Sequence, residues 1–253
     1  NHGSCMGGNC PQAGVDGVFG SAVHFDGSND YISIPHNDQF DRIEDEDKLT
    51  IASWINIEGW PQGWFPILDQ YEENSDWGWM FEVSDPGNLT LWTAPDVATG
   101  CSFPFTLGVW YHVAVSYDRN LEYADFYVNG EQICHNAYGN DISETSGEPI
   151  YIGFSRGGGD EYTFGRIDEL CVFDQALTAE DIWLIYQSGS FSPPEWFNVD
   201  PILGILPVNS SLPVQATFDS TNLQEGTYTT TLYVTSNDPL NMMVEIPVTM
   251  TVE

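Results

Sequence analysis

A strand that runs directly into one short amphipathic helix, at residues 165–189, is the feature that most limits what this chain can fold into. The helix is predicted by Thr178 as N-cap, by Asp181 three positions later as a weak capping box, and by Gly189 at the C-terminal cap. The strand at 166–173 alternates between two faces. We expect one face to carry Ile167, Glu169, Cys171 and Phe173, and the other Asp168, Leu170 and Val172.

Several more strands precede this segment. Residues 49–57, 65–70, 77–83, 89–93, 110–117 and 124–128 have strand patterns, and Asn129-Gly130 is a strong hairpin signal. Residues 1–20 and the acidic run at 38–48 are interpreted as loops. Many short strands with one closing helix predict an all-β protein, an antiparallel sandwich.

Five ordered motifs resemble the laminin-G-like jelly rolls of the concanavalin A-like lectin/glucanase superfamily. They are FDGSNDYI at 25–32, WYHVAVSYD at 110–118, YVNG at 127–130, YIG at 151–153 and the closing GRIDELCVFDQALTAEDI at 165–182. The resemblance implies a jelly-roll β-sandwich at 1–189. Domains of this kind usually serve in adhesion, carbohydrate binding or surface display.

The composition of the chain changes after the helix. Residues 190–195 are interpreted as a linker, and 196–253 as four strands at 196–200, 212–219, 227–236 and 243–253. This tail resembles the latter part of bacterial Ig-like modules, through Trp196, the SNDP run at 236–239 and the alternation of apolar and polar residues at 243–253. Such modules have about seven strands in roughly 100 residues, so the first strands are missing from this partial Ig-like domain. We hypothesise that another chain supplies them by strand donation; truncation, or packing of the four strands on the jelly roll, is the alternative.

The charge of the chain is −33, from 5 basic and 38 acidic side chains. Such a field repels nucleic acid and anionic membranes and attracts divalent cations. The sequence contains neither a segment of transmembrane length nor a signal peptide. A solvated acidic surface of a secreted or cell-surface protein is the simplest interpretation.

The five cysteines and two N-glycosylation motifs, at Asn88 and Asn209, indicate an oxidising compartment. Cys5 and Cys10 are close enough for a local disulfide, and Cys101 with Cys134 is the candidate for a second. Other pairings remain open, and one cysteine is left over.

Catalysis is not expected. The run at 153–157 matches G-x-S-x-G, but a nucleophile elbow needs a helix straight after its serine, and three glycines follow here. No strand carries the E-x-D-x-E spacing of related β-glucanases, and the acidic residues 44–47 lie in a predicted loop.

Calcium is the metal that the acidic residues favour. By resemblance to jelly rolls whose first and last strands share a structural calcium, Asp26 and Asp168 are candidate ligands, with Asp30 as a weaker one. The alternative is that Asp26 caps its turn and Asp168 pairs with backbone or Arg166.

Glycan binding needs exposed aromatic rings beside polar groups. Trp60 and Trp64 lie in a Gly/Pro loop and are the tryptophans that we expect to be exposed. The sequence therefore predicts a non-catalytic extracellular adhesion or carbohydrate-binding module. The alternative is a structural subunit of a filament or surface array that self-associates by strand complementation.

Overall fold

The fold is known from a computed structural model that describes residues 3–36, 40–72, 77–94, 97–142, 147–156, 160–188, 196–200, 211–221, 223–235 and 243–252. Contacts divide the chain into two units, Asn1–Ser190 and Phe191–Glu253. The predicted linker at 190–195 and the predicted glycosylation site Asn209 lie outside the described residues.

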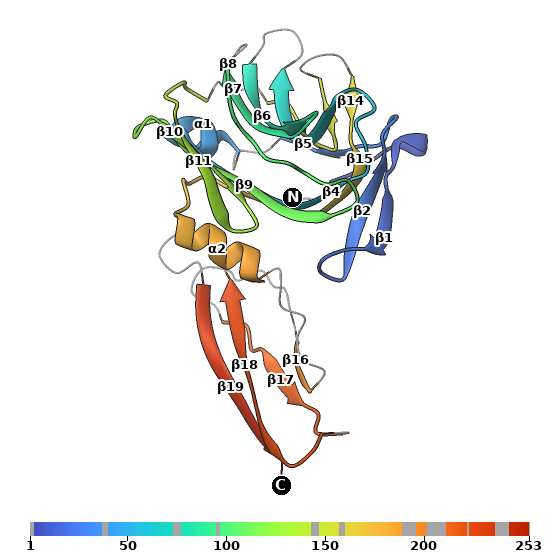
Figure 1. Cartoon of the computed structure of the whole chain (residues 1–253), viewed down its shortest axis with the longest axis vertical. Coiled ribbons are helices and arrows are strands. Elements are labelled where there is room, and N and C mark those ends of the chain that lie inside the picture. The colour runs from blue at the N-terminus through green and yellow to red at the C-terminus, as the bar shows by residue number, and fades with distance from the viewer. Residues whose placement is uncertain are drawn as a thin grey trace. The chain divides into compact units, whose positions relative to one another are not determined.

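The first unit is an antiparallel sandwich of two large sheets (Figure 1). The seven-stranded sheet runs in the order β1 (Gln12–Asp16), β2 (Ser21–Asp26), β15 (Phe164–Phe173), β4 (Lys48–Ile57), β9 (Trp110–Asp118), β10 (Tyr123–Val128), β11 (Glu131–Ala137). The six-stranded sheet runs in the order β3 (Ile32–Ile34), β12 (Ile150–Ile152), β5 (Trp64–Glu72), β6 (Trp77–Ser84), β7 (Asn88–Ala94), β8 (Val97–Ser102). A small hairpin of β13 (Phe154–Ser155) and β14 (Glu161–Tyr162) accompanies them. The predicted all-β jelly-roll sandwich is confirmed.

The core lies between the two sheets and is built by alternate residues of their strands. In β4, Leu49, Ile51, Ile55 and Ile57 are buried in one apolar cluster, as their spacing predicts. The facing sheet contributes side chains from β6, which are Trp79, Phe81 and Val83. Burial of these side chains is the main stabilising contribution to the sandwich.

The closing strand departs from regular alternation. A register shift in its pairing with β4 lies between Asp168 and Cys171, and Glu169 has a positive φ of 48°. This β-bulge reverses the faces, so Leu170 and Val172 pack against the core on the same side as Ile167. The prediction that Ile167 shares a face with Cys171 and Phe173 is therefore wrong.

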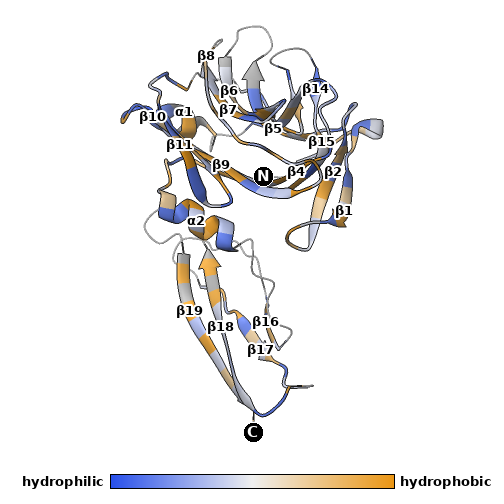
Figure 2. Cartoon of the chain, viewed as in Figure 1, coloured by the Kyte–Doolittle hydropathy of each residue, from blue (hydrophilic) through white to orange (hydrophobic). Residues whose placement is uncertain are grey.

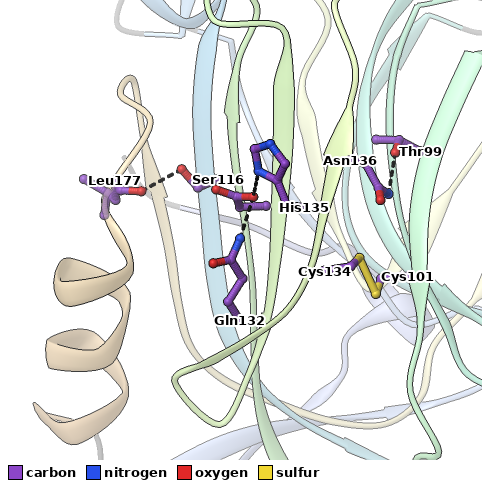
Figure 3. Close-up of polar contacts among 9 residues, drawn as sticks. Thr99, Cys101, Ser116, Gln132, Cys134, His135, Asn136 and Leu177 are labelled. Carbon is purple, nitrogen blue, oxygen red and sulfur yellow. Dashed lines mark hydrogen bonds and ion pairs between the residues drawn. A yellow bond between two sulfur atoms is a disulfide. The ribbon is translucent and has the colours of Figure 1, made fainter.

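Helix α2 (Ala179–Ser188) begins as its sequence predicts. The hydroxyl of Thr178 accepts a bond from the Asp181 N–H, and the Asp181 carboxylate accepts one from the Thr178 N–H, which completes the capping box. Ser116 Oγ donates to the Leu177 carbonyl at 2.8 Å, which fastens the start of the helix to β9 (Figure 3).

Covalent and polar contacts join the edges of the two sheets. Cys101 of β8 and Cys134 of β11 form a disulfide, and Asn136 Nδ2 donates to Thr99 Oγ1 and to the Gly100 carbonyl, at 2.9 Å each (Figure 3). The second disulfide joins Cys5 and Cys10. Both predicted disulfides are confirmed, and Cys171 is the free cysteine.

Two segments interpreted as loops contain regular structure. Strand β1 lies within residues 1–20, and helix α1 (Asp41–Glu46) lies within the acidic run. Phe40 and Ile43 are buried in the core cluster, so α1 is anchored by two apolar side chains in an otherwise acidic stretch. A 3₁₀ turn at Gly7–Asn9 lies within the loop that the Cys5–Cys10 disulfide closes.

The second unit contains two antiparallel pairs. Strand β16 (Phe197–Asp200) pairs with β17 (Gln215–Phe218), and β18 (Gly226–Thr235) pairs with β19 (Met243–Val252). Trp196 is buried, and its ring lies 6.2 Å from that of Tyr228, which joins the pairs. Apolar residues recur along β18 and β19 (Figure 2).

Candidate ligand-binding surface

Two carboxylates lie on the outer face of the six-stranded sheet. Trp79, Phe81 and Val83 of β6 point into the core, so Met80 and Glu82 point to the opposite face. Asp69 of β5 lies directly across from Met80 in the register. Both carboxylates are nevertheless buried, because the β13–β14 hairpin lies against β5.

The hairpin is held by three polar contacts. The Arg156 N–H donates to Asp69 Oδ2 at 3.1 Å, and Ser155 Oγ donates to the Met80 sulfur at 2.9 Å. Thr163 Oγ1 donates to the Pro66 carbonyl. These contacts place Glu161, which pairs with Ser155 across the hairpin, near Asp69 and Glu82.

Burial and neighbouring acidic charges raise the pKa values of Glu82 and Glu161. Burial raises the pKa of Glu82 to about 8; the Trp92 hydrogen bond opposes this, and the charges of Glu161 and Asp69 add to it. Burial and then the charge of Asp69 raise the pKa of Glu161 to about 7. Carboxyl groups perturbed in this way are enriched at functional sites.

Aromatic rings border the acidic groups. Trp92 of β7 donates its indole N–H to Glu82 Oε1 at 2.8 Å. The rings of Tyr162 and Phe154 stack at 4.9 Å, and Tyr151 lies 5.5 Å from Phe154. The acidic–aromatic face is the set Asp69, Glu82, Trp92, Tyr151, Glu161 and Tyr162. Half-buried rings beside carboxylates can stack on the C–H surface of a sugar and accept hydrogen bonds from its hydroxyls.

Sequence reasoning missed this face, because its members are spread from residue 69 to residue 162. One local signal was present: Glu82 interrupts an otherwise apolar strand, with core residues on both sides of it.

The predicted calcium ligands lie in two separate places. Asp26 and Asp30 share a turn, where Asp30 Oδ2 accepts the Asp26 N–H at 3.0 Å and Asp26 Oδ1 accepts the Ser28 N–H at 2.9 Å. Burial raises the pKa of Asp30. These are the bonds of a capped turn.

Asp168 is not brought to that turn. Asp26 pairs with Phe164 in the β2–β15 register, so Asp168 is four residues, about 13 Å, farther along β15. Its Oδ2 accepts the N–H groups of Val18 and Phe19, and its Oδ1 that of Glu169. Among the residues described, no three acidic, histidine or cysteine side chains are grouped to hold a metal. A shared calcium centre therefore does not fit, and calcium binding at either place stays a prediction.

The remaining predicted site residues are less exposed than expected. Trp60 and Trp64 are both half-buried, and Trp60 packs against the core cluster, so the prediction that they are exposed is wrong. Flanking glycine and proline indicated a loop but gave no information on the core beneath it.

Asn88 donates its amide to the Thr90 hydroxyl at 2.9 Å, and glycosylation there stays a prediction.

The G-x-S-x-G serine lies in an antiparallel hairpin. Ser155 is fully buried and its strand pairs with β14, so it lacks the exposed strand-to-helix turn of a nucleophile elbow. No helix among the described residues is long and apolar enough to cross a membrane.

Solved structures with a similar fold include sugar-binding and receptor-binding domains. Domain 4 of AbnA, a GH43 extracellular arabinanase from Geobacillus stearothermophilus solved with arabinotriose, is 19% identical with a TM-score of 0.56, over 71% of this chain and 82% of that one. A heptameric SAP-like pentraxin from Limulus polyphemus is 19% identical with a TM-score of 0.52, over 80% of this chain and 97% of that one. Botulinum neurotoxin type C, described as dependent on two ganglioside molecules for cell entry, is 16% identical with a TM-score of 0.51, over 72% of this chain and 46% of that one.

These likenesses establish the fold. This chain matches less than half of the neurotoxin chain. No curated protein sequence matches the chain significantly. The model of the concanavalin A-like lectin/glucanases superfamily matches residues 26–183. Because this match covers more than half of its residues, the chain belongs to the concanavalin A-like lectin/glucanases superfamily.

Proposed function

We propose that this chain is a non-catalytic, extracellular carbohydrate-binding module whose ligand lies on the acidic–aromatic face. The observation that carries the proposal is the cluster of Glu161, Glu82 and Asp69 beside the half-buried rings of Trp92 and Tyr162. The two disulfides support an extracellular location. The sugar ligands named for two of the similar structures support a glycan as ligand.

The experiment starts with the full chain on a glycan array that includes arabino-oligosaccharides and ganglioside sugars. Calorimetry on the best ligand then compares Tyr162→Ala and Glu161→Gln with Tyr123→Ala, a half-buried tyrosine of the other sheet. Each of the first two substitutions is expected to weaken binding at least about tenfold, or about 1.4 kcal/mol. Tyr123→Ala should bind as the unmodified chain does. Equal affinity in all three variants would place the ligand elsewhere.

Trp60 and Trp64 form the alternative binding place within the same proposal. Both retain some exposure, and a partly exposed aromatic ring can stack on a sugar. Loss of binding in Trp60→Ala, with Tyr162→Ala unaffected, would move the site to this loop.

A structural role is the second candidate, and the β18–β19 pair favours it. Val234, Val244 and Ile246 are 44%, 49% and 42% exposed on one face of this two-stranded sheet. Strands from another chain would cover that face and would complete the partial Ig-like module that the sequence resembles. Light scattering tests this: oligomers that dissociate in Ile246→Lys support it, and a monomer at all concentrations excludes it.

A further inference from the structure

Glu161 is a half-buried carboxylate with neither a hydrogen bond nor an ion pair among the described residues. The described basic side chains are engaged elsewhere. Lys48 pairs with Asp118, Arg119 with Asp141, Arg166 with Glu58, and Arg156 with Glu148. Arg156 and Arg166 are equally near to Glu161 along the chain, and the Arg156 guanidinium also lies 4.6 Å over the Tyr151 ring.

Beneath Glu161 lies a second carboxyl group that is incompletely bonded. Glu82 is 2% exposed, and its Oε1 is held by Trp92. Its Oε2 is buried without a hydrogen-bond partner among the described residues. A buried polar atom left in this way is costly, so the face favours a ligand that supplies a hydrogen-bonding partner.

The rings beside these carboxyl groups suit the same kind of ligand. The electron-rich faces of tyrosine and tryptophan attract a cation within about 6 Å, most strongly where water is partly excluded. An organic cation also fits better than a metal ion, because no three acidic, histidine or cysteine side chains in the described part of the chain are grouped to hold a metal.

From this placement we infer that the sugar bound at the acidic–aromatic face carries a protonated amine, as in a de-acetylated hexosamine, and that the amine contacts Glu161. The inference rests on the proposed function and narrows its ligand class. The ammonium group donates charge-assisted hydrogen bonds to Glu161, while the sugar ring stacks on Tyr162 or Trp92.

The test compares two trisaccharides with one backbone, the glucosamine trimer and its fully N-acetylated form, by calorimetry on the full chain. The measurement is made at a pH where the free amine is protonated. Because the whole chain carries a charge of −33, it attracts any cation. Glu131→Gln is therefore the matched control, since it removes the same charge from an exposed position on β11.

The free-amine trimer is expected to bind at least about tenfold more tightly than the N-acetylated one. Glu161→Gln should abolish this preference for the free amine, while Glu131→Gln should keep it. A preference that survives in Glu161→Gln would show a chain-wide charge effect and overturn the inference. Equal or tighter binding of the N-acetylated trimer, still weakened by Tyr162→Ala, would overturn the inference and leave the proposed function standing. An array on which glycans bind but neither trimer does would likewise overturn the inference alone, and an array with no glycan bound would remove both.

Discussion

The indole N–H of Trp92 donates a 2.8 Å hydrogen bond to Oε1 of Glu82, from one strand of the six-stranded sheet to the next. This bond holds in place a carboxyl group that is 2% exposed. Because burial raises its pKa to about 8, the group is protonated in the folded protein at neutral pH.

Glu82 should make the fold less stable as pH rises. Its pKa is raised on folding, so its stabilising contribution is complete below pH 4.5 and is lost as pH rises through about 8. The loss at pH 9 is on the order of 4 kcal/mol. Glu82→Gln keeps an acceptor for Trp92 and removes the titration. We expect the free energy of unfolding of this variant, measured in urea, to be nearly independent of pH between 7 and 9. If the free energy of unfolding changed with pH as steeply in Glu82→Gln as in Glu131→Gln, the raised pKa would not belong to Glu82.

His112 should limit stability on the acid side. The ring lies beneath α2, 5.6 Å from the Trp54 ring and 5.7 Å from that of Tyr186, and burial lowers its pKa to about 4. A lowered histidine pKa stabilises the fold above about pH 6.5, and that contribution is lost as pH falls toward 4. The loss is roughly 3 kcal/mol. The free energy of unfolding should fall less steeply with decreasing pH in His112→Phe than in the unmodified chain. An equal fall in both would contradict this role of His112.

Asp168 should be the more important of the two separated aspartates for stability. It is 6% exposed and accepts three backbone N–H groups, whereas Asp26 is exposed in its turn. Asp168→Ala leaves three part-buried N–H donors without this acceptor and should cost roughly 2–4 kcal/mol. Asp26→Ala should cost under about 1 kcal/mol. Chemical denaturation measures both. Equal costs would mean that the Asp168 carboxylate does not hold the segment at Val18 and Phe19 in place.

The two disulfides should differ in their contribution. Cys101 and Cys134 are 33 residues apart, and Cys5 and Cys10 are 5 apart. Because a longer closed loop restricts the unfolded chain more, their loss should cost about 4 and about 2 kcal/mol respectively. Serine pairs at each position, compared by urea unfolding, test this order. The reverse order would contradict the loop-entropy argument.

Calcium binding can be tested at the Asp26–Asp30 turn. If the Asp26–Asp30 turn binds calcium, the ion should raise the melting temperature, because it binds only the folded chain. Asp26→Ala should remove that rise. A melting temperature unaffected by calcium or by a chelator would exclude a structural ion there.

Sequence reasoning located most strands and the helix, since alternation and capping are local properties. The alternation of β4 and the Thr178–Asp181 capping box needed no knowledge of distant residues. The bulge at Glu169 was not predictable, because it depends on how β15 pairs with β4. Helix α1 was missed for a similar reason: Phe40 and Ile43 reveal their role only when the core is assembled.

The candidate site was harder to predict than the fold. Asp69 and Glu82 are brought together by the β5–β6 register, and Glu161 joins them because the β13–β14 hairpin folds against β5. In a linear sequence each is one more acidic residue among 38. The tryptophan loop, in contrast, was prominent in sequence but is half-buried in the structure.

The bond between Cys101 and Cys134 also sets how far the chain can be drawn out under tension. A pulling force applied at the two termini passes from β8 to β11 through the sulfur atoms, so β9 and β10 lie outside the loaded path. Those 33 residue steps would otherwise add about 120 Å to the extended contour. A chain stretched between its termini would therefore lengthen less, and would retain β9 and β10 as a shielded loop.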